Sequence, residues 1–248
     1  MFIVVHKPEY KYFKEYLDSF KYKNDKILLF SYNRPLSFDS KGDYLFVNTF
    51  DVEIMLLCHS KGNSVSILNT EQLTRDWYLK KYTHDLGRLL SNDVSLTLYD
   101  YSLFNTSLIP LGLKASRIIP YKCKISEIPD YSVEVDYDVA FVGTKSVRRQ
   151  KILGDLEDRG VKVKYIESWG EERDKEVQSC KVLLNIHYAD DYRVYESIRC
   201  DRWLTFGKVV VTETSLDITY PNHEKLIISS YDNLVETVVN SIDVLQNS

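Results

Sequence analysis

The sequence predicts an α/β fold made of two domains, each built on a largely parallel β-sheet. Short runs rich in β-branched and aromatic residues recur along the chain and alternate with stretches of helical periodicity. The length of 248 residues exceeds one average domain and suits two, each large enough to bury a core. A hydrophobic content of 44%, with only nine glycines and six prolines, indicates an ordered globular chain.

The first half contains five predicted strands with helical stretches between them. Between the first two strands, apolar residues recur at i, i+3, i+7 and i+10, which places Tyr10, Phe13, Leu17 and Phe20 on one helical face. The opposite face is predicted to carry Lys11, Lys14, Tyr16 and Lys21. Such a face could contact anionic lipid, although a solvated face is the simpler interpretation. The predicted strands are residues 2–6, 26–32, 44–49, 64–69 and 94–99.

The junction between the domains is predicted near residue 115, which gives an N-terminal domain of residues 1–115 and a C-terminal domain of residues 116–248. Residues 111–131 show no periodicity, and three prolines, Pro110, Pro120 and Pro129, lie in or beside this segment. Beyond it, strands and helices alternate again. The predicted strands of the second half are residues 139–142, 161–166, 182–188, 209–212 and 226–229.

Helix boundaries in the second half have recognisable signals. Ser146 is a suitable N-cap for the helix after the first strand, and Gly160 is a natural stop for it. A later helix is expected to begin at Arg193 and to end at Gly207, and residues 233–245 have the apolar spacing of a core-facing helix. Two Rossmann-like halves of this kind are expected to face a cleft at the carboxyl ends of both sheets, which favours an enzyme acting on a nucleotide-bearing substrate.

Composition excludes several other classes of protein. A formal net charge of −4 argues against broad binding to nucleic acid. No segment reaches the roughly 18 apolar residues of a membrane span, and the apolar run at the start is too short for a signal peptide, so we expect a cytoplasmic protein without stable membrane insertion. The four cysteines are far apart and show no paired metal spacing, which favours reduced thiols.

Three cations mark the first strand-to-helix turn of the second half, in the run DVAFVGTKSVRRQKIL of residues 138–153. Lys145, Arg148 and Arg149 stand where a helix N-terminus repels cations and attracts anions. With Gly143 and Thr144 they form a pattern typical of a phosphate cradle. The alternative is that the three side chains extend into water.

A second group of polar residues follows a buried strand. His187 lies in the loop at the carboxyl end of residues 182–186, and Tyr195, Glu196 and Arg199 open the next helix. A carboxylate there could accept hydrogen bonds from both hydroxyls of a ribose. The alternative is an ordinary surface pair between Glu196 and Arg199.

These segments resemble the nucleotide-binding half of glycosyltransferases of the GT-B architecture, particularly the small spore-coat-like and viral sugar transferases. The resemblance lies in DVAFVGTKSVRRQKIL, SCKVLLNIHY, YESIR and FGKVVVTETSLD, which cover most of residues 138–217. It implies that Glu196 holds the donor ribose and that Lys145, Arg148 and Arg149 neutralise the donor diphosphate. The chain departs from the two-glutamate pattern of retaining members, because Leu204 stands eight residues after Glu196. The resemblance therefore does not fix the stereochemistry.

Two further motifs have competing interpretations. Asp136-Tyr137-Asp138 matches an Asp-x-Asp metal motif, but it precedes a strand and so lies at the wrong end of the sheet, and we expect no metal site there. Thr214 and Ser215 follow the last long strand, where they could bind a phosphate or form a plain turn.

The first half offers fewer signals for the acceptor side. Its polar groups at strand ends are His6, Glu71 and Asp100, and an inverting transferase would need one of them as a general base. Together the observations predict a metal-independent glycosyltransferase that moves a sugar from a nucleotide-diphosphate donor to a hydroxyl of a glycan or other acceptor, without a cofactor. A non-catalytic nucleotide-sugar-binding or phosphate-binding module is the alternative.

Overall fold

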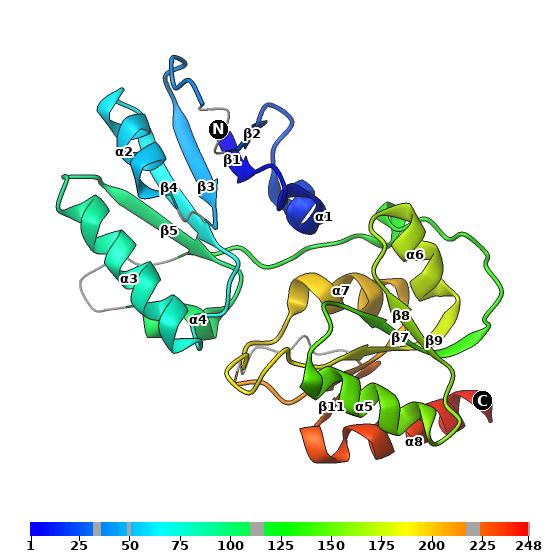
Figure 1. The fold of residues 1–248 in the computed structure, drawn as a ribbon. Helices are drawn as coiled ribbons and strands as arrows, with labels where there is room; N and C mark the ends of the chain where they lie inside the picture. Colours follow the sequence, from blue (N-terminus) through cyan, green and yellow to red (C-terminus); the bar gives the residue numbers. More distant parts are fainter. Residues whose placement is uncertain (32–35, 49–50, 110–116, 217–223, 248) are drawn as a thin grey trace. The chain divides into compact units, whose positions relative to one another are not determined.

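The computed structural model describes residues 1–31, 36–48, 51–109, 117–216 and 224–247 (Figure 1). The chain forms two compact units, Met1–Tyr121 and Lys122–Ser248, here called the N-terminal and C-terminal units. The predicted junction at residue 115 lies outside the described residues. Every strand pair in the described parts of both units is parallel, so the chain has the predicted α/β class with Rossmann-like sheets.

The N-terminal unit contains, within its described residues, a six-stranded sheet in the order β2-β1-β3-β4-β5-β6. Its strands are β1 (Phe2–His6), β2 (Lys26–Phe30), β3 (Asp43–Val47), β4 (Ser64–Asn69), β5 (Leu96–Asp100) and β6 (Arg117–Ile118). Its helices are α1 (Tyr10–Phe20), α2 (Val52–Ser60), α3 (Asp76–Leu90) and α4 (Leu103–Leu108). Helices α2 and α3 cover one face of the sheet and α1 covers the other (Figure 1).

The predicted position of Tyr16 on the solvent face of α1 is wrong. Tyr16 is fully buried beside Leu17, and its hydroxyl donates a hydrogen bond to the Ile119 carbonyl at 2.6 Å. Phe13, Tyr16, Leu17 and Phe20 follow the i, i+3, i+4, i+7 spacing of a full helical stripe. Because a tyrosine can bury its ring when its hydroxyl finds a partner, Tyr16 completes the apolar face.

The C-terminal unit contains, in the part that the structure describes, a five-stranded sheet in the order β11-β10-β9-β7-β8. Its strands are β7 (Tyr137–Val142), β8 (Val163–Ile166), β9 (Cys180–Asn185), β10 (Val209–Glu213) and β11 (Leu226–Ser229). Its helices are α5 (Val147–Glu157), α6 (Glu171–Gln178), α7 (Ser197–Phe206) and α8 (Leu234–Gln246), with short 3-10 turns at Ile125–Glu127 and Tyr231–Asn233.

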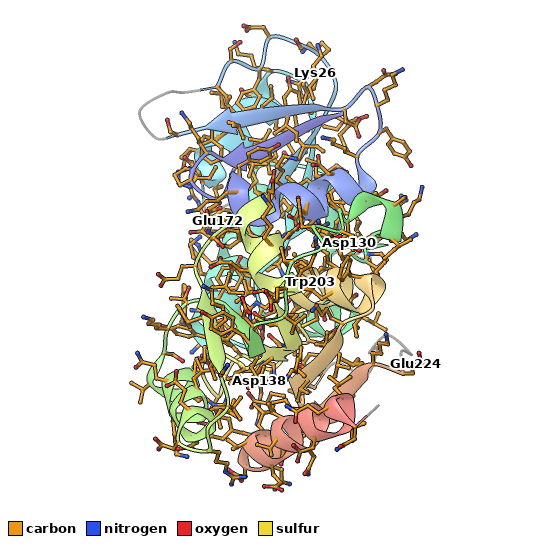
Figure 2. The ribbon with its side chains drawn as sticks, turned by 90° about the vertical axis from the view of Figure 1, so that its right-hand side faces the viewer. Lys26, Asp130, Asp138, Glu172, Trp203 and Glu224 are labelled. Atoms are coloured by element: carbon orange, nitrogen blue, oxygen red, sulfur yellow. The ribbon has the colours of Figure 1, made fainter. Side chains whose placement is uncertain are left out.

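Alternation along the C-terminal strands builds two cores, one on each face of this sheet. Val139, Phe141, Val182 and Leu184 pack against α5 and α8, whereas the intervening residues pack against α6 and α7. The two helix pairs lie on opposite sides of the sheet in Figure 1. Trp203 of α7, labelled in Figure 2, belongs to the second core.

Helix α7 begins later than the sequence predicts. It starts at Ser197, and residues 193–196 belong to the preceding loop, so the predicted start at Arg193 is wrong. Val194 and Tyr195 are buried as loop residues, which explains why their apolar character resembled a helix start. The predicted end is confirmed, because Gly207 has a φ of +96° and caps the helix in the left-handed conformation.

The strand order fixes where a ligand site can form in the C-terminal unit. From β7 the chain continues to β8 on one side, whereas from β9 it continues to β10 on the other side. The carboxyl ends of the adjacent strands β7 and β9 therefore mark the point where the winding reverses. Ligands of open parallel sheets bind at such points, because the loops there diverge and leave a crevice.

Candidate functional site

The loop between β7 and α5, residues 143–146, lies at this reversal point and is here called the Gly143 turn. Gly143 has a φ of +154°, which residues with a side chain rarely adopt. A Cβ at Gly143 would lie 3.2 Å from Arg149 Nη1 and 3.5 Å from Arg199 Nη2. Two guanidinium groups therefore converge on the side of the turn that glycine leaves open.

Arg149 is held rigidly at the turn by backbone carbonyls. Its side chain is 3% exposed, its Nε donates to the Ile186 carbonyl at 2.9 Å, and its Nη1 donates to the Thr144 carbonyl at 2.9 Å. Burial, together with the positive charge of Arg199, lowers the pKa of Arg149 to about 10. The group is thus cationic at neutral pH but poorly compensated.

Arg199 and Glu196 form an ion pair beside the Gly143 turn. Arg199 Nη1 donates to Glu196 Oε2 at 2.6 Å and to Asn185 Oδ1 at 2.9 Å. Glu196 Oε2 also lies 3.9 Å from Arg149 Nη2. The pair that the sequence offered as an alternative to ribose binding is therefore present, but it lies beside the Gly143 turn and is only partly exposed.

Arg148 points to a different partner from the one that the sequence suggested. Both of its terminal nitrogens donate to the Glu213 carboxylate, Nη1 at 2.6 Å, and its Nε donates to Asp190 Oδ1 at 2.8 Å. Its guanidinium stacks over the Tyr231 ring at 3.7 Å. Although burial opposes the charge, the bonds from Glu213 and Asp190 raise the pKa of Arg148. The anion expected beside this cation is supplied by the protein itself.

Lys145 is the accessible cation of the turn. The side chain is exposed, as is that of Thr144, and its ammonium lies 4.7 Å from the centre of the Tyr165 ring. The Tyr165 hydroxyl in turn donates to the Gly143 carbonyl. Among the described residues no carboxylate forms an ion pair with Lys145, so this charge is available to a ligand.

His187, Thr214 and Ser215 lie together where β9 and β10 end. His187 Nε2 lies 3.3 Å from the Thr214 carbonyl oxygen and 3.1 Å from Ser215 Oγ. The His187 backbone N–H donates to Glu213 Oε2 at 3.0 Å, which ties this group to the Arg148 pair. Burial lowers the pKa of His187, so the imidazole is neutral at pH 7.

Tyr195 lies away from this group. The ring is buried in the core between the sheet, α6 and α7, and its hydroxyl donates to Asp201 Oδ1 at 2.9 Å. Burial raises the pKa of Asp201 to about 7. The structure therefore brings together Gly143, Lys145, Arg149, Glu196 and Arg199, and gives Tyr195 a packing position instead.

The acceptor-side candidates of the N-terminal unit have local partners of their own. Asp100 is fully buried and accepts hydrogen bonds from Asn69 Nδ2 at 2.7 Å, Asn105 Nδ2 at 3.1 Å and the Ser102 N–H at 2.8 Å. Burial raises its pKa to about 7. These bonds tie the end of β5 to the end of β4 and to the first turn of α4, which indicates a structural role for Asp100.

Glu71 and His6 are more accessible than Asp100. Glu71 Oε2 lies 3.5 Å from Arg75 Nη1, and its side chain is 33% exposed. His6 Nδ1 lies 3.7 Å from Glu9 Oε1. Neither geometry singles out one of the two as a general base.

The Asp136-Tyr137-Asp138 motif lies at the start of β7, whereas the Gly143 turn follows the end of that strand, so the two lie at opposite ends of the sheet. Asp138 is labelled in Figure 2. Asp138 Oδ1 pairs with Lys181 Nζ at 2.6 Å, and Oδ2 accepts from the Lys162 N–H at 2.9 Å. Within the described ranges, no group of three histidine, cysteine or acidic side chains is placed to hold a metal ion. In the same part of the chain, no helix combines the length and apolar character needed to cross a membrane.

Asn185 and Glu213 contact the site residues, although neither was predicted to do so from the sequence. Asn185 ends the apolar strand β9 and is fully buried, so a polar residue closing an apolar run was the available signal for it. Glu213 has no comparable signal, because its bond to Arg148 joins residues 65 positions apart.

Comparison with known proteins adds relatives but no named activity. No protein-family profile matches the chain. It is 37% identical over 248 residues to "Uncharacterized protein L140" of Acanthamoeba polyphaga mimivirus, which covers 93% of this chain and 76% of that protein. The chain belongs to the L140 family.

Two other mimivirus relatives are much longer than this chain. It is 33% identical to "Uncharacterized protein L137" over 95% of its own length, but this is 32% of that protein. For "Uncharacterized protein L138" the identity is 28%, over 97% of this chain and 29% of that protein. The chain thus spans about a third of these two relatives.

Proposed function

We propose that the C-terminal unit binds the diphosphate of a nucleotide-sugar at the Gly143 turn, and that the protein is a metal-independent glycosyltransferase. The observation that carries this proposal is the convergence of Arg149 and Arg199 on Gly143, at the point where the strand order reverses. The resemblance to GT-B sugar transferases adds the reaction class. The N-terminal unit would supply the acceptor side of a two-domain arrangement with a cleft.

Electrostatics at the turn supports an anionic ligand. Arg149, Arg199 and Lys145 carry three positive charges, and Glu196 supplies one negative charge beside them. The N-terminus of α5 adds the partial positive charge of its free N–H groups. A buried, undercompensated cation such as Arg149 gains most from a bound anion, because the surrounding dielectric is low.

The same groups suit the chemistry of sugar transfer. The bond between the anomeric carbon and the diphosphate oxygen breaks, a bond from that carbon to the acceptor oxygen forms, and the acceptor proton passes to a base. Negative charge grows on the diphosphate as it leaves. Preorganised cations at the turn would stabilise that charge without a metal ion.

Glu196 can bind the donor ribose through one of its two carboxylate oxygens. Its Oε2 already accepts from Arg199 and lies near Arg149, which fixes the carboxylate in place. Its Oε1 is then the oxygen available to a ribose hydroxyl. The ion pair and the ribose role are therefore compatible rather than exclusive.

One observation favours the second candidate, a non-catalytic binding module. Asp100, the buried carboxyl whose raised pKa would suit a base, is enclosed by Asn69, Asn105 and Ser102 and has no exposed surface. A protein without a general base at the acceptor would still bind a nucleotide-sugar at the Gly143 turn, but it would not transfer the sugar.

The proposal is tested by calorimetry with UDP, GDP, dTDP and CMP, with and without excess chelator. At least one of them should bind, chelation should change its affinity by less than about twofold, and Lys145→Ala should weaken it by about 3–10-fold because one charged hydrogen bond is lost at an exposed position. Lys151→Ala is the matched control, since it removes the same charge from α5, where Lys151 is exposed and paired with Asp155 at 2.9 Å.

The outcomes separate the candidates. Absence of binding for all four nucleotides, or equal binding by parent and Lys145→Ala, would contradict a phosphate site at the turn. Binding together with release of sugar from a panel of nucleotide-sugars supports the transferase. Binding without any release supports the module.

A further inference from the structure

His187 contains a buried nitrogen that no described residue bonds. The side chain is 3% exposed, and its Nδ1 has no hydrogen-bond partner among the described residues. Its Nε2 faces the Thr214 carbonyl at 3.3 Å and Ser215 Oγ at 3.1 Å. A buried polar atom without a partner costs free energy comparable to a lost hydrogen bond, so its presence calls for an explanation.

The partners of Nε2 determine the protonation of the ring. A carbonyl oxygen can only accept a hydrogen bond, and the Ser215 hydroxyl can donate to the Glu213 carbonyl oxygen at 3.5 Å, so we assign the ring hydrogen to Nε2, which faces both Thr214 and Ser215. Burial lowers the pKa of His187 and keeps the ring neutral. Nδ1 is therefore a lone-pair acceptor, and it needs an O–H or N–H donor.

His187 lies next to the proposed diphosphate site. Ile186, the preceding residue, supplies the carbonyl that holds Arg149, and the charges of Glu196, Glu213 and Arg148 all act on the imidazole. Within the described part of the chain, Ser197 Oγ is a second buried atom without a partner, and Ser197 is the residue after Glu196. Two unused polar atoms thus lie in the immediate surroundings of Glu196.

We propose that His187 Nδ1 accepts a hydrogen bond from a hydroxyl group of the bound ligand, so that the site recognises a hydroxyl-bearing part beside the diphosphate. This inference rests on the proposed function, because the diphosphate places the rest of the ligand. The diphosphate of a nucleotide-sugar cannot serve, since both of its phosphates are esterified and fully ionised at neutral pH and so offer no hydrogen to Nδ1. The hydroxyl belongs either to the ribose or to the transferred sugar.

His187→Gln tests the proposal by affinity. A glutamine amide can still donate to the Thr214 carbonyl, but it lacks an acceptor at the position of Nδ1. Four ligands are compared by calorimetry: pyrophosphate, the nucleoside diphosphate that binds best, its 2′,3′-dideoxy analogue and the corresponding nucleotide-sugar. We expect pyrophosphate affinity to change by less than about twofold and the affinity for at least one hydroxyl-bearing ligand to fall by about 3–10-fold.

The ligands identify the source of the hydroxyl. A penalty for the nucleoside diphosphate that disappears with the dideoxy analogue assigns the ribose. A penalty confined to the nucleotide-sugar assigns the transferred sugar. Equal affinity of parent and variant for all ligands would mean that only water meets Nδ1 and would overturn the inference, while pyrophosphate binding would still uphold the diphosphate site. No pyrophosphate binding by the parent would overturn both.

A measurement on the parent protein tests the proposal even if the variant binds poorly because it is misfolded. The ¹⁵N resonance of His187 Nδ1, assigned among the five histidines by its loss in His187→Gln, reports hydrogen bonding to that nitrogen directly. It should shift on addition of the hydroxyl-bearing ligand and stay in place with pyrophosphate. A chemical shift that changes with neither ligand, or by the same amount with both, would contradict the proposal.

Discussion

At the scale of the residue, Gly143 explains how two arginines can share one small site. Like charges at close range repel, so Arg149 and Arg199 are compatible only because carbonyl oxygens, Asn185 and Glu196 hold each guanidinium in place. Both guanidinium groups can approach the turn closely because residue 143 has no side chain. The turn thus stores electrostatic strain that an anion would relieve.

Gly143→Ala should damage both stability and binding. The new Cβ would meet Arg149 Nη1 at 3.2 Å in a backbone conformation unsuited to alanine, so we expect a loss of about 1–3 kcal/mol in the free energy of unfolding and at least about tenfold weaker nucleotide binding. Chemical denaturation and calorimetry measure the two effects.

Gly154→Ala is the control for that substitution. Gly154 lies within α5, and a Cβ there would have no neighbour within 4 Å, so the change should stabilise the protein by about 0.4–1 kcal/mol and leave binding intact. If Gly143→Ala bound nucleotide as well as Gly154→Ala does, the arginines would not form the anion site.

At the scale of the element, the cations at the N-terminus of α5 have two different environments. Arg148 pairs with Glu213 of β10, which removes its repulsion from the helix dipole. Neither Arg149 nor Lys145 has a comparably close carboxylate among the residues that the structure describes, and both remain beside the free N–H groups of the first turn. Ser146 caps this turn by accepting a hydrogen bond from the Arg149 N–H at 3.2 Å.

Substitutions of Ser146 should separate capping from ligand binding. Ser146→Ala removes the cap and should lower the free energy of unfolding by about 1 kcal/mol. Ser146→Asp keeps a capping oxygen and suits the dipole, so stability should match or exceed that of the parent, yet its negative charge should weaken nucleotide binding several-fold. Thermal unfolding and calorimetry read out the two effects. Parent-like affinity in Ser146→Asp would show that no anion approaches the start of α5.

At the scale of the whole molecule, each unit contains a carboxyl group whose pKa is raised to about 7 by burial, Asp100 in the N-terminal unit and Asp201 in the C-terminal unit. A raised pKa means that the folded state binds the proton more tightly than the unfolded state. Stability from each group is therefore complete below the unfolded value near 3.8 and is lost as the pH rises through about 7. His187, whose pKa burial lowers, opposes this trend by losing stability as the pH falls below about 6.5.

Asp201→Asn should flatten this pH dependence in the C-terminal unit. The amide oxygen can still accept from the Tyr195 hydroxyl, while the cost of ionising a buried group disappears. We expect the stability added by the substitution to be small near pH 4 and to be larger by at least about 1 kcal/mol at pH 8, measured by denaturant titration. Thr205→Val is a control, because it removes a neighbouring hydroxyl without changing charge. A variant that gained as much at pH 4 as at pH 8 would contradict a raised pKa for Asp201.

The local features of this protein could be predicted from its amino-acid sequence. Alternating apolar runs predicted the parallel strands, Ser146 marked the start of α5, and Gly207 marked the end of α7, because each signal depends on a few adjacent residues. The Gly143 turn was recognisable for the same reason. Tyr16 was misplaced where a tyrosine could be either buried or exposed, and only the distant Ile119 carbonyl decides between them.

The tertiary structure alone decided which cations share the turn. Three basic residues looked equivalent in sequence, but β10 carries Glu213 to Arg148, and the adjacency of β7 and β9 carries the Ile186 carbonyl to Arg149. Arg199 then enters from α7, and Arg148 turns away from the site. Strand order sets these partners across 37 and 65 residues, and no local pattern encodes them, because pairing in a parallel sheet joins segments that are distant along the chain.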